Sequence, residues 1–154
     1  MRRLLIIACS QRKHPAPHLL AAIERYDGPA FRVLRKRIAA APQDAPEVLI
    51  LSAKYGLIAS TDRIPVYDCR MTLALARRMG PAVLAAVRRA LESQSWRAVG
   101  LCLGRHYRPA LDGLTHIVPA SVNLTHIGGG LGRRLTNLLA WLRLTSPVHA
   151  GGSQ

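Results

Sequence analysis

The stretch "EVLILSAKYG", residues 47–56, changes from apolar to polar at its midpoint. Its four consecutive apolar residues, 48–51, are typical of a strand buried on both faces of a parallel sheet. Ser52, Lys54 and Tyr55 follow directly, before a glycine that permits a sharp turn. In open α/β sheets, ligands bind beyond the carboxyl ends of the strands. The stretch therefore predicts an α/β fold and makes these three polar residues candidates for a ligand site.

The rest of the chain alternates apolar segments with helical patterns. Further strands are predicted at residues 3–8, 98–103 and 114–118. Helices are predicted over residues 18–26, from 29 onward, over 72–78 and 81–92, and at the end of the domain up to about 144. Residues 54–70 have little periodicity and are expected to form a long irregular segment. The pattern predicts a single α/β domain, residues 1–145, with a mainly parallel sheet of about four strands, helices on both faces, and a flexible C-terminal tail over 146–154.

The overall charge is strongly positive, because 22 Lys and Arg residues stand against 8 Asp and Glu, a formal net charge of +14. Such an excess attracts polyanions: nucleic acid, nucleotides or an acidic membrane surface. Alternatively, the arginines only coat the surface, since they are spread along the chain. No apolar run approaches the ~20 residues that span a bilayer, and the run after Arg3 is too short for a secretory signal. We therefore expect a cytoplasmic protein with no membrane partner.

Cysteines and histidines do not form the patterns of a disulfide framework or a metal site. The three cysteines are an odd number without a C-x-x-C pair, which favours a reducing compartment. His14 and His18 are separated by two prolines that oppose a helical pair of ligands. His116 and His126 lack cysteine or carboxylate partners at zinc spacing. We expect no metal and no cofactor.

The segment "CSQRK", residues 9–13, follows the first predicted strand. Backbone N–H groups of the turn and the Ser10 hydroxyl can hold an anion there, and Lys13 can add charge. No histidine–carboxylate pair is evident around Cys9, so a nucleophilic role lacks support, and the alternative is a small buried cysteine at a strand end. Cys9, Ser10 and Lys13 are candidate ligand-binding residues.

The second cluster, after the strand at 47–52, carries the candidate catalytic groups. Lys54 beside Tyr55 offers a cation and an aromatic ring, which together suit a phosphate and a base. Asp68, if held near Lys54 or Arg70, can serve as a general base or orient a ligand hydroxyl. Alternatively, Lys54 is solvated, Tyr55 packs over the sheet, and Asp68 is an ordinary ion-pair partner. We assign catalysis to Asp68, Lys54 and Tyr55, and ligand binding to Ser52 and Tyr67.

Two further segments are candidates for ligand binding. Gly104 in "GRHYRPAL" permits close backbone approach, and Tyr107 can stack on a base or donate to a ligand oxygen, unless it packs in the core. "HIGGGLGRR" precedes the last predicted helix, where free N–H groups and the helix dipole favour phosphate. It matches neither the P-loop nor the Rossmann fingerprint, and the alternative is a flexible turn with solvated arginines. Its candidate residues are Gly129, Gly130, Gly132 and Arg133.

With these motifs in place, the chain resembles an uncharacterised family of small bacterial proteins. Its members share a C-S-x-x-K element, an S-A-K-Y-G-L segment, a Y-D element and a glycine-rich turn before a final W-L helix. In this chain these are Cys9, Ser10 and Lys13, residues 52–57, Tyr67 and Asp68, residues 128–132, and Trp141 and Leu142.

More distantly, the chain is similar to the YaaA peroxide-stress family, which has an L-S-G-x-Y-G segment followed by a P-Y element and a methionine. The matching residues are Leu51, Ser52, Tyr55, Gly56, Tyr67 and Met71. Three features depart from that pattern: Val66 separates Pro65 from Tyr67, Lys54 replaces a different residue type, and this chain is much shorter. The resemblance implies nucleic-acid binding and does not transfer the stress role.

These observations predict a small nucleotide- or nucleobase-directed enzyme with a pocket where the strand-tip clusters converge. Glycosidic-bond cleavage or transfer suits these groups, because one carboxylate and several cations can stabilise charge separation at a ribose. The alternative is a non-enzymatic basic nucleic-acid-binding protein similar to YaaA, with arginines on phosphates and tyrosines on unpaired bases. A third hypothesis, a structural or partner-binding protein, predicts dispersed strand-tip residues and no pocket.

Overall fold

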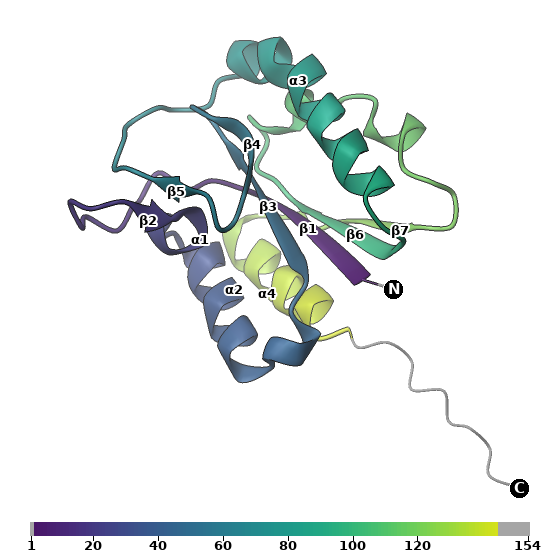
Figure 1. Cartoon of the computed structure of the whole chain (residues 1–154), viewed down its shortest axis with the longest axis horizontal. Coiled ribbons are helices and arrows are strands. Elements are labelled where there is room, and N and C mark those ends of the chain that lie inside the picture. The colour runs from purple at the N-terminus through teal and green to yellow at the C-terminus, as the bar shows by residue number, and fades with distance from the viewer. Residues whose placement is uncertain (1, 145–154) are drawn as a thin grey trace, which may run out of the picture.

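The computed structural model describes residues 2–144 and contains a five-stranded sheet in the order β4-β3-β1-β6-β7 (Figure 1). Its strands are β1 (Arg2–Ala8), β3 (Glu47–Ser52), β4 (Gly56–Ala59), β6 (Trp96–Cys102) and β7 (Asn123–His126). β1 pairs in parallel with β3 and β6, and β7 pairs in parallel with β6, whereas β4 is antiparallel to β3. The predicted α/β class with a mainly parallel sheet is confirmed, with five strands in place of about four.

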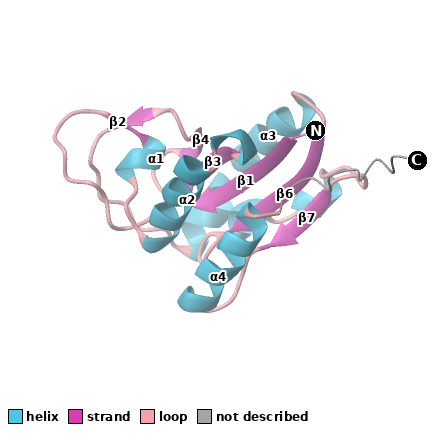
Figure 2. Cartoon of the chain, turned by 90° about the horizontal axis from the view of Figure 1, so that it is seen from below, coloured by secondary structure: helices cyan, strands magenta, loops and turns pink. Residues whose placement is uncertain are grey.

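Helices cover both faces of this sheet (Figures 1 and 2). α2 (Pro29–Ala40) and α4 (Leu131–Leu142) lie on one face, and α3 (Leu73–Glu92) lies on the other. Successive side chains of a strand point to opposite faces, so Leu4 of β1 packs on the α3 side and Leu5 packs on the side of α2 and α4. This burial on two sides explains why the central strand is continuously apolar.

A small substructure beside the sheet is held together by a buried arginine. It comprises β2 (Leu20–Ala21), α1 (Ala22–Arg25) and β5 (Arg63–Ile64), with β2 antiparallel to β5. The guanidinium of Arg25, which is fully buried, donates to the carbonyl oxygens of His14, Ala16, His18 and Ile64 at 2.5–3.3 Å. Backbone carbonyls thus solvate this cation, and no carboxylate within residues 2–144 pairs with it.

Two predictions about these segments were wrong. The helix expected over 18–26 is reduced to the single turn α1, because Leu20 and Ala21 pair with β5 instead. The supposedly irregular segment 54–70 contains β4 and β5. Gly56, with a φ of 73°, reverses the chain directly after β3, so that the residues after it pair back onto that strand.

The two helices predicted over 72–78 and 81–92 form the single helix α3. Pro81 lies inside it, where a proline cannot donate to the carbonyl of Arg77. Arg77 is exposed, so water can satisfy that carbonyl. The break is bridged by tertiary packing, since Gly80 lies against the carbonyl oxygens of Pro109 and Ala110, 3.7 Å from where a Cβ atom would stand.

The strand predicted over 114–118 is also wrong, because this segment begins with a 3-10 helix, η3 (Leu114–His116). Gly113, with a φ of 90°, starts this turn, and Leu114 packs into the core on the α3 side. The additional parallel strand is β7, whose sequence "NLTH" is not an apolar run because β7 is at the sheet edge. Two more 3-10 helices are η1 (Pro42–Asp44) and η2 (Arg108–Leu111).

The expected tail, residues 146–154, lies outside the described residues. Within residues 2–144, none of the helices combines the length and the apolar character needed to cross a bilayer.

Candidate functional site

The carboxyl ends of β1, β3 and β6 lie at one edge of the sheet, because these strands are parallel. A cavity of about 350 Å³ opens there, which is within the size range of small-molecule sites. It is lined by Cys9, Ser10, Gln11, Asp68, Cys69, Arg70, Met71, His106 and Tyr107. Four of the predicted site residues, Cys9, Ser10, Asp68 and Tyr107, therefore face a common space although they are far apart in the sequence. We call this space the main cavity.

A smaller cavity of about 160 Å³ shares Cys9, Ser10 and Tyr107 with the main cavity. Gly104, as predicted, is part of its lining, together with Gly28 and Arg134. The three shared residues make the two cavities neighbours, and we call the smaller one the side cavity.

Arg134 supplies a partly unsatisfied cation to the side cavity. Its Nε is buried and has no hydrogen-bond partner within residues 2–144, while its Nη2 donates to the carbonyl of Gly129 over 3.4 Å. A buried donor without a partner is costly, so an anion bound here would gain a hydrogen bond that the protein does not make. The glycine-rich turn was predicted to use Arg133, Gly129, Gly130 and Gly132. None of these residues lines either cavity, and Arg134 lines the side cavity instead.

Ser52 is the centre of a hydrogen-bond network at the end of β3. Its Oγ accepts from the backbone N–H groups of Lys54 (3.1 Å) and Tyr55 (3.0 Å) and lies 2.9 Å from the Tyr67 hydroxyl. Two accepted bonds occupy both lone pairs of Oγ, so its own proton is donated to Tyr67. Tyr67 in turn is hydrogen-bonded to the hydroxyl of Tyr26. The fully buried Ser52 thus holds the turn and Tyr67 rather than facing a ligand.

Tyr67 lies between two lysines that were predicted as site residues. The Nζ of Lys13 is 4.6 Å from its ring centroid, and the Nζ of Lys54 is 5.5 Å from it. The ring of Tyr55 meets it edge-on at 5.2 Å between centroids. These contacts place two cations near one aromatic ring, as expected for a region that attracts anions.

Burial keeps the phenols of this region protonated. It raises the pKa of Tyr26 to about 12, and it also raises the pKa values of Tyr67 and Tyr107 above the ordinary tyrosine range. The Tyr107 hydroxyl lies 3.1 Å from the Sγ of Cys9. Near neutral pH this phenol is a hydrogen-bond donor at the boundary of the two cavities, available to a thiol or to a ligand oxygen.

Ser10 has a structural role in the loop after β1. Its Oγ accepts from the N–H of Gly28 over 3.1 Å and donates to the carbonyl of Arg12 over 2.6 Å. Because its proton is already used, the predicted role of this hydroxyl as an anion donor would require breaking an internal bond. Residue 28 has room only for a glycine, since a Cβ there would stand 2.7 Å from the Ser10 Cβ.

Asp68 is the one carboxylate in the lining of the main cavity. It is exposed, and no basic group within residues 2–144 lies within 4.0 Å of its oxygens. By contrast, Asp27 is bridged by Arg12, Arg32 and Arg35 at 3.6, 3.2 and 2.7 Å. Hydrogen bonds from Arg32 and Arg35 lower the pKa of the Asp27 carboxyl. The alternative of an ion-paired Asp68 is thus not what the structure shows, and its carboxylate is available to a ligand.

Lys54 and Tyr55, predicted as catalytic, are exposed and are not part of the lining of either cavity. They lie beside Tyr67, on the outer side of the turn that Ser52 holds.

Several residues of the site were missed from the sequence. Tyr26 ends a one-turn helix and carried no motif, yet its hydroxyl joins the network of Ser52 and Tyr67. Gln11, Arg70 and His106 lie within or next to the quoted motifs, so proximity to those motifs was the available signal. Cys69 directly follows Asp68 of the Y-D element, so the same signal applied to it. Its Sγ lies 3.7 Å from the carbonyl oxygen of Ala53. No group of three or more His, Cys, Asp or Glu side chains suited to a metal occurs within residues 2–144.

Residues 4–141 match the family described as "Family of unknown function (DUF6884)". The chain belongs to this family. The prediction of an uncharacterised family is therefore confirmed. None of the curated proteins matches the chain.

Among solved structures, this DUF6884 chain is similar to the crystal structure of AF0587, a protein of unknown function, with a TM-score of 0.56 and 12% sequence identity. The similarity covers 94% of this chain and 45% of that one, so this chain spans less than half of the solved protein. At such low identity the likeness concerns the fold alone.

Proposed function

We propose that this DUF6884 protein is a nucleotide- or nucleobase-directed enzyme whose ligand occupies the main and side cavities at the carboxyl edge of the sheet. One observation carries the proposal. Asp68, a carboxylate without an ion pair, and Arg134, a cation whose Nε has no hydrogen-bond partner within residues 2–144, line adjoining cavities. A nucleotide carries both a ribose with hydroxyl groups and a phosphate, and these two groups complement that pair.

Each side chain has a role in this proposal. Arg134 binds the phosphate, together with the backbone N–H of Leu131, the first residue of α4, which also lines the side cavity. Tyr107, at the boundary of the cavities, donates to a ligand oxygen or stacks on the base. Asp68 binds a ribose hydroxyl or acts as the general base. Lys13 and Lys54, which lie around Tyr67, add the positive potential that draws in the anion.

Cleavage or transfer at the glycosidic bond is the reaction these groups suit best. As the bond between ribose and base breaks, its electron pair leaves with the base, which takes up a proton, and positive charge develops on the ribose. The carboxylate of Asp68 can stabilise that charge and deprotonate the water or alcohol that adds to the sugar.

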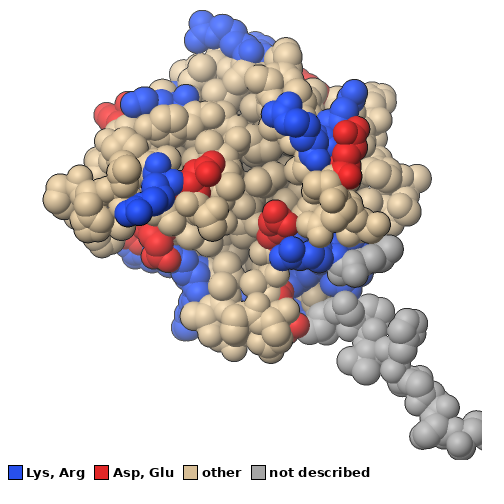
Figure 3. Space-filling model, viewed as in Figure 1, with Lys and Arg blue, Asp and Glu red and all other residues tan. Residues whose placement is uncertain are grey.

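A second candidate is binding of nucleic acid without catalysis, as the similarity to YaaA implies. The net charge of +14 favours it. On the face seen in Figure 3, however, the basic residues form separate groups, several of them beside acidic ones, rather than one continuous surface. This arrangement is the reason that we place the pocket first.

Thermal unfolding distinguishes the two candidates. The protein is heated with nucleobases, nucleosides, nucleotides and short single- and double-stranded DNA and RNA, at about 50 and 500 mM salt, since high salt removes most phosphate-driven binding to a polyanion. The enzyme proposal predicts a nucleotide shift that persists at the higher salt and is reduced in Asp68→Asn and Arg134→Gln. Arg88→Gln, an exposed change on α3, serves as the control.

Stabilisation by DNA or RNA alone, lost at high salt and equal in all variants, would replace the enzyme with a nucleic-acid binder. A shift that survives would then be followed by a turnover assay for release of the free base.

A further inference from the structure

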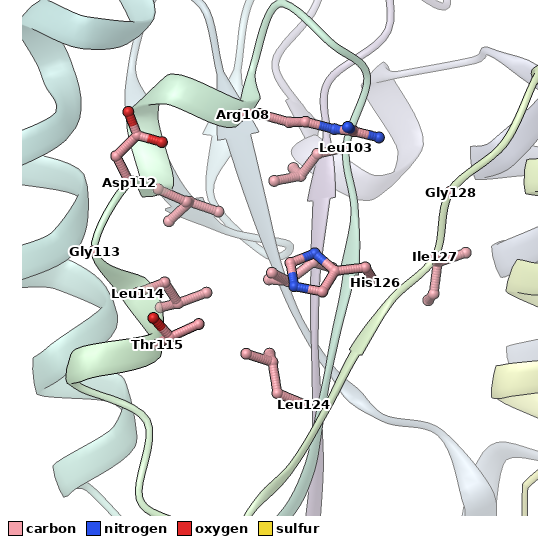
Figure 4. Close-up of a pocket in the computed structure, with 12 residues that line it drawn as sticks. Leu103, Arg108, Asp112, Gly113, Leu114, Thr115, Leu124, His126, Ile127 and Gly128 are labelled. Atoms are coloured by element: carbon pink, nitrogen blue, oxygen red, sulfur yellow. The ribbon is translucent and has the colours of Figure 1, made fainter.

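A further cavity of about 350 Å³ lies on the α3 side of the sheet, between the edge strand β7 and the segment containing η2 and η3 (Figure 4). None of its lining residues lines the main cavity or the side cavity. Tyr107 faces the main cavity and the next residue, Arg108, faces this one, so η2 separates the two spaces. We infer that this third cavity is a separate binding site for a small amphipathic anion, with an apolar body and a single carboxylate that Arg108 binds.

Leucines make the interior of this cavity apolar. They are Leu101 and Leu103 from β6 and the residue that follows it, Leu124 from β7, and Leu111 and Leu114 from η2 and η3. Four of these five belong to the buried core on the α3 side, and Leu124 packs against it. The walls are therefore fixed by the core, and the space is preformed rather than opened by a ligand.

Arg108 provides the charge at the rim. In Figure 4 its side chain extends across the top of the cavity, above Leu103 and toward the backbone at Gly128. A Cβ atom on Gly128 would stand 3.7 Å from Arg108 Nη2, so the end of the guanidinium lies close to the backbone there. Within residues 2–144, Arg108 donates no side-chain hydrogen bond and has no carboxylate within 4.0 Å. Its planar set of donors is free to bind a carboxylate in two places at once.

The other polar groups limit the ligand to one negative charge. Asp112 is on the opposite, helical wall and would repel a second anionic group. His126 projects from β7 into the cavity, toward Leu114, and Thr115 lies beside Leu114. Both can hydrogen-bond to a neutral polar atom without demanding charge. A single carboxylate at the Arg108 end with an apolar chain between the leucines satisfies every part of the lining.

The test is calorimetric titration of the full chain with straight-chain carboxylates from butanoate to octanoate and with the matching neutral amides. Because the chain enters an apolar cavity, affinity should rise about three- to fourfold for each added methylene until the space is filled. Arg108→Gln should lower the affinity for the carboxylates at least tenfold and change the affinity for the amides less than twofold. Arg105→Gln, which removes another exposed charge three residues earlier, should change the affinity for both series less than twofold.

This inference can be tested separately from the proposed function. Asp68→Asn should leave carboxylate binding unchanged, because Asp68 lines the other cavity. Affinity that does not depend on chain length would overturn the inference, as would equal losses in Arg108→Gln and Arg105→Gln. Loss of carboxylate binding in Asp68→Asn would also overturn it, since the ligand would then occupy the main cavity.

Discussion

Replacing Ser52 with alanine tests whether the end of β3 is held by one buried hydroxyl. The substitution removes two accepted bonds from the backbone N–H groups of Lys54 and Tyr55 and one donated bond to Tyr67, at 3.1, 3.0 and 2.9 Å. A typical intramolecular hydrogen bond contributes about 1 kcal/mol net, so the three together give a loss of roughly 3 kcal/mol in the free energy of unfolding. For a chain of this size, that loss lowers Tm by roughly 6–12 °C.

Urea unfolding followed by circular dichroism measures this change, with an unaltered dependence on denaturant expected because the fold is kept. Ser95→Ala is the matched control, since Ser95 is exposed and its hydroxyl makes no hydrogen bond within residues 2–144. The exchange rates of the amides of Lys54 and Tyr55 should rise in Ser52→Ala alone. A loss below about 1 kcal/mol, or one equal to that of Ser95→Ala, would refute the reasoning that these bonds fix the turn.

Three other predictions concern packing and protonation. Gly100→Ala places a Cβ 2.7 Å from Cε2 of Trp141, so it should lower the free energy of unfolding, measured in urea, by about 1–3 kcal/mol. A loss below about 0.5 kcal/mol would contradict the tight packing of α4 on β6. Gly28→Ala should displace Ser10 and the loop after β1, because the new Cβ would stand 2.7 Å from the Ser10 Cβ. Unchanged amide chemical shifts in that loop would contradict this expectation. The pKa of Tyr26 is raised from 10.0 to about 12, so the stability that its neutral form provides is complete below pH 10 and is lost between pH 10 and 12. Tyr26→Phe should flatten that alkaline fall in stability, and identical pH profiles for the two proteins would argue against a buried neutral phenol.

The sheet was predictable because its central strands are buried on two sides. Apolar runs identify β1, β3 and β6 without ambiguity, and their parallel order brings their carboxyl ends to one edge. Cys9 and Tyr107, which follow β1 and β6, were therefore predictable as neighbours from the topology.

The edge strands were harder to predict, because an edge position does not demand apolar residues. β7 has the polar sequence "NLTH", whereas the apolar segment 114–118 lies outside the sheet. Helix α3 continues through Pro81 because Gly80 packs against η2, a tertiary contact that no local pattern records.

The choice between Arg133 and Arg134 could not be made from the sequence. Both follow the same glycine-rich turn, and only the rotation of α4 against the sheet decides which one enters the side cavity. The sequence also could not show that Asp27 is bridged by three arginines whereas Asp68 has no ion pair within residues 2–144.

The proposal that Arg134 holds a phosphate beside Asp68 is tested most directly by comparing one nucleotide with its own nucleoside. Calorimetric titration at about 500 mM salt removes general attraction to the basic surface. The account predicts that Arg134→Gln lowers the affinity for the nucleotide at least tenfold and the affinity for the nucleoside less than twofold, because only the nucleotide carries the phosphate. Equal effects on both ligands, or no binding of either by the unaltered protein, would contradict it.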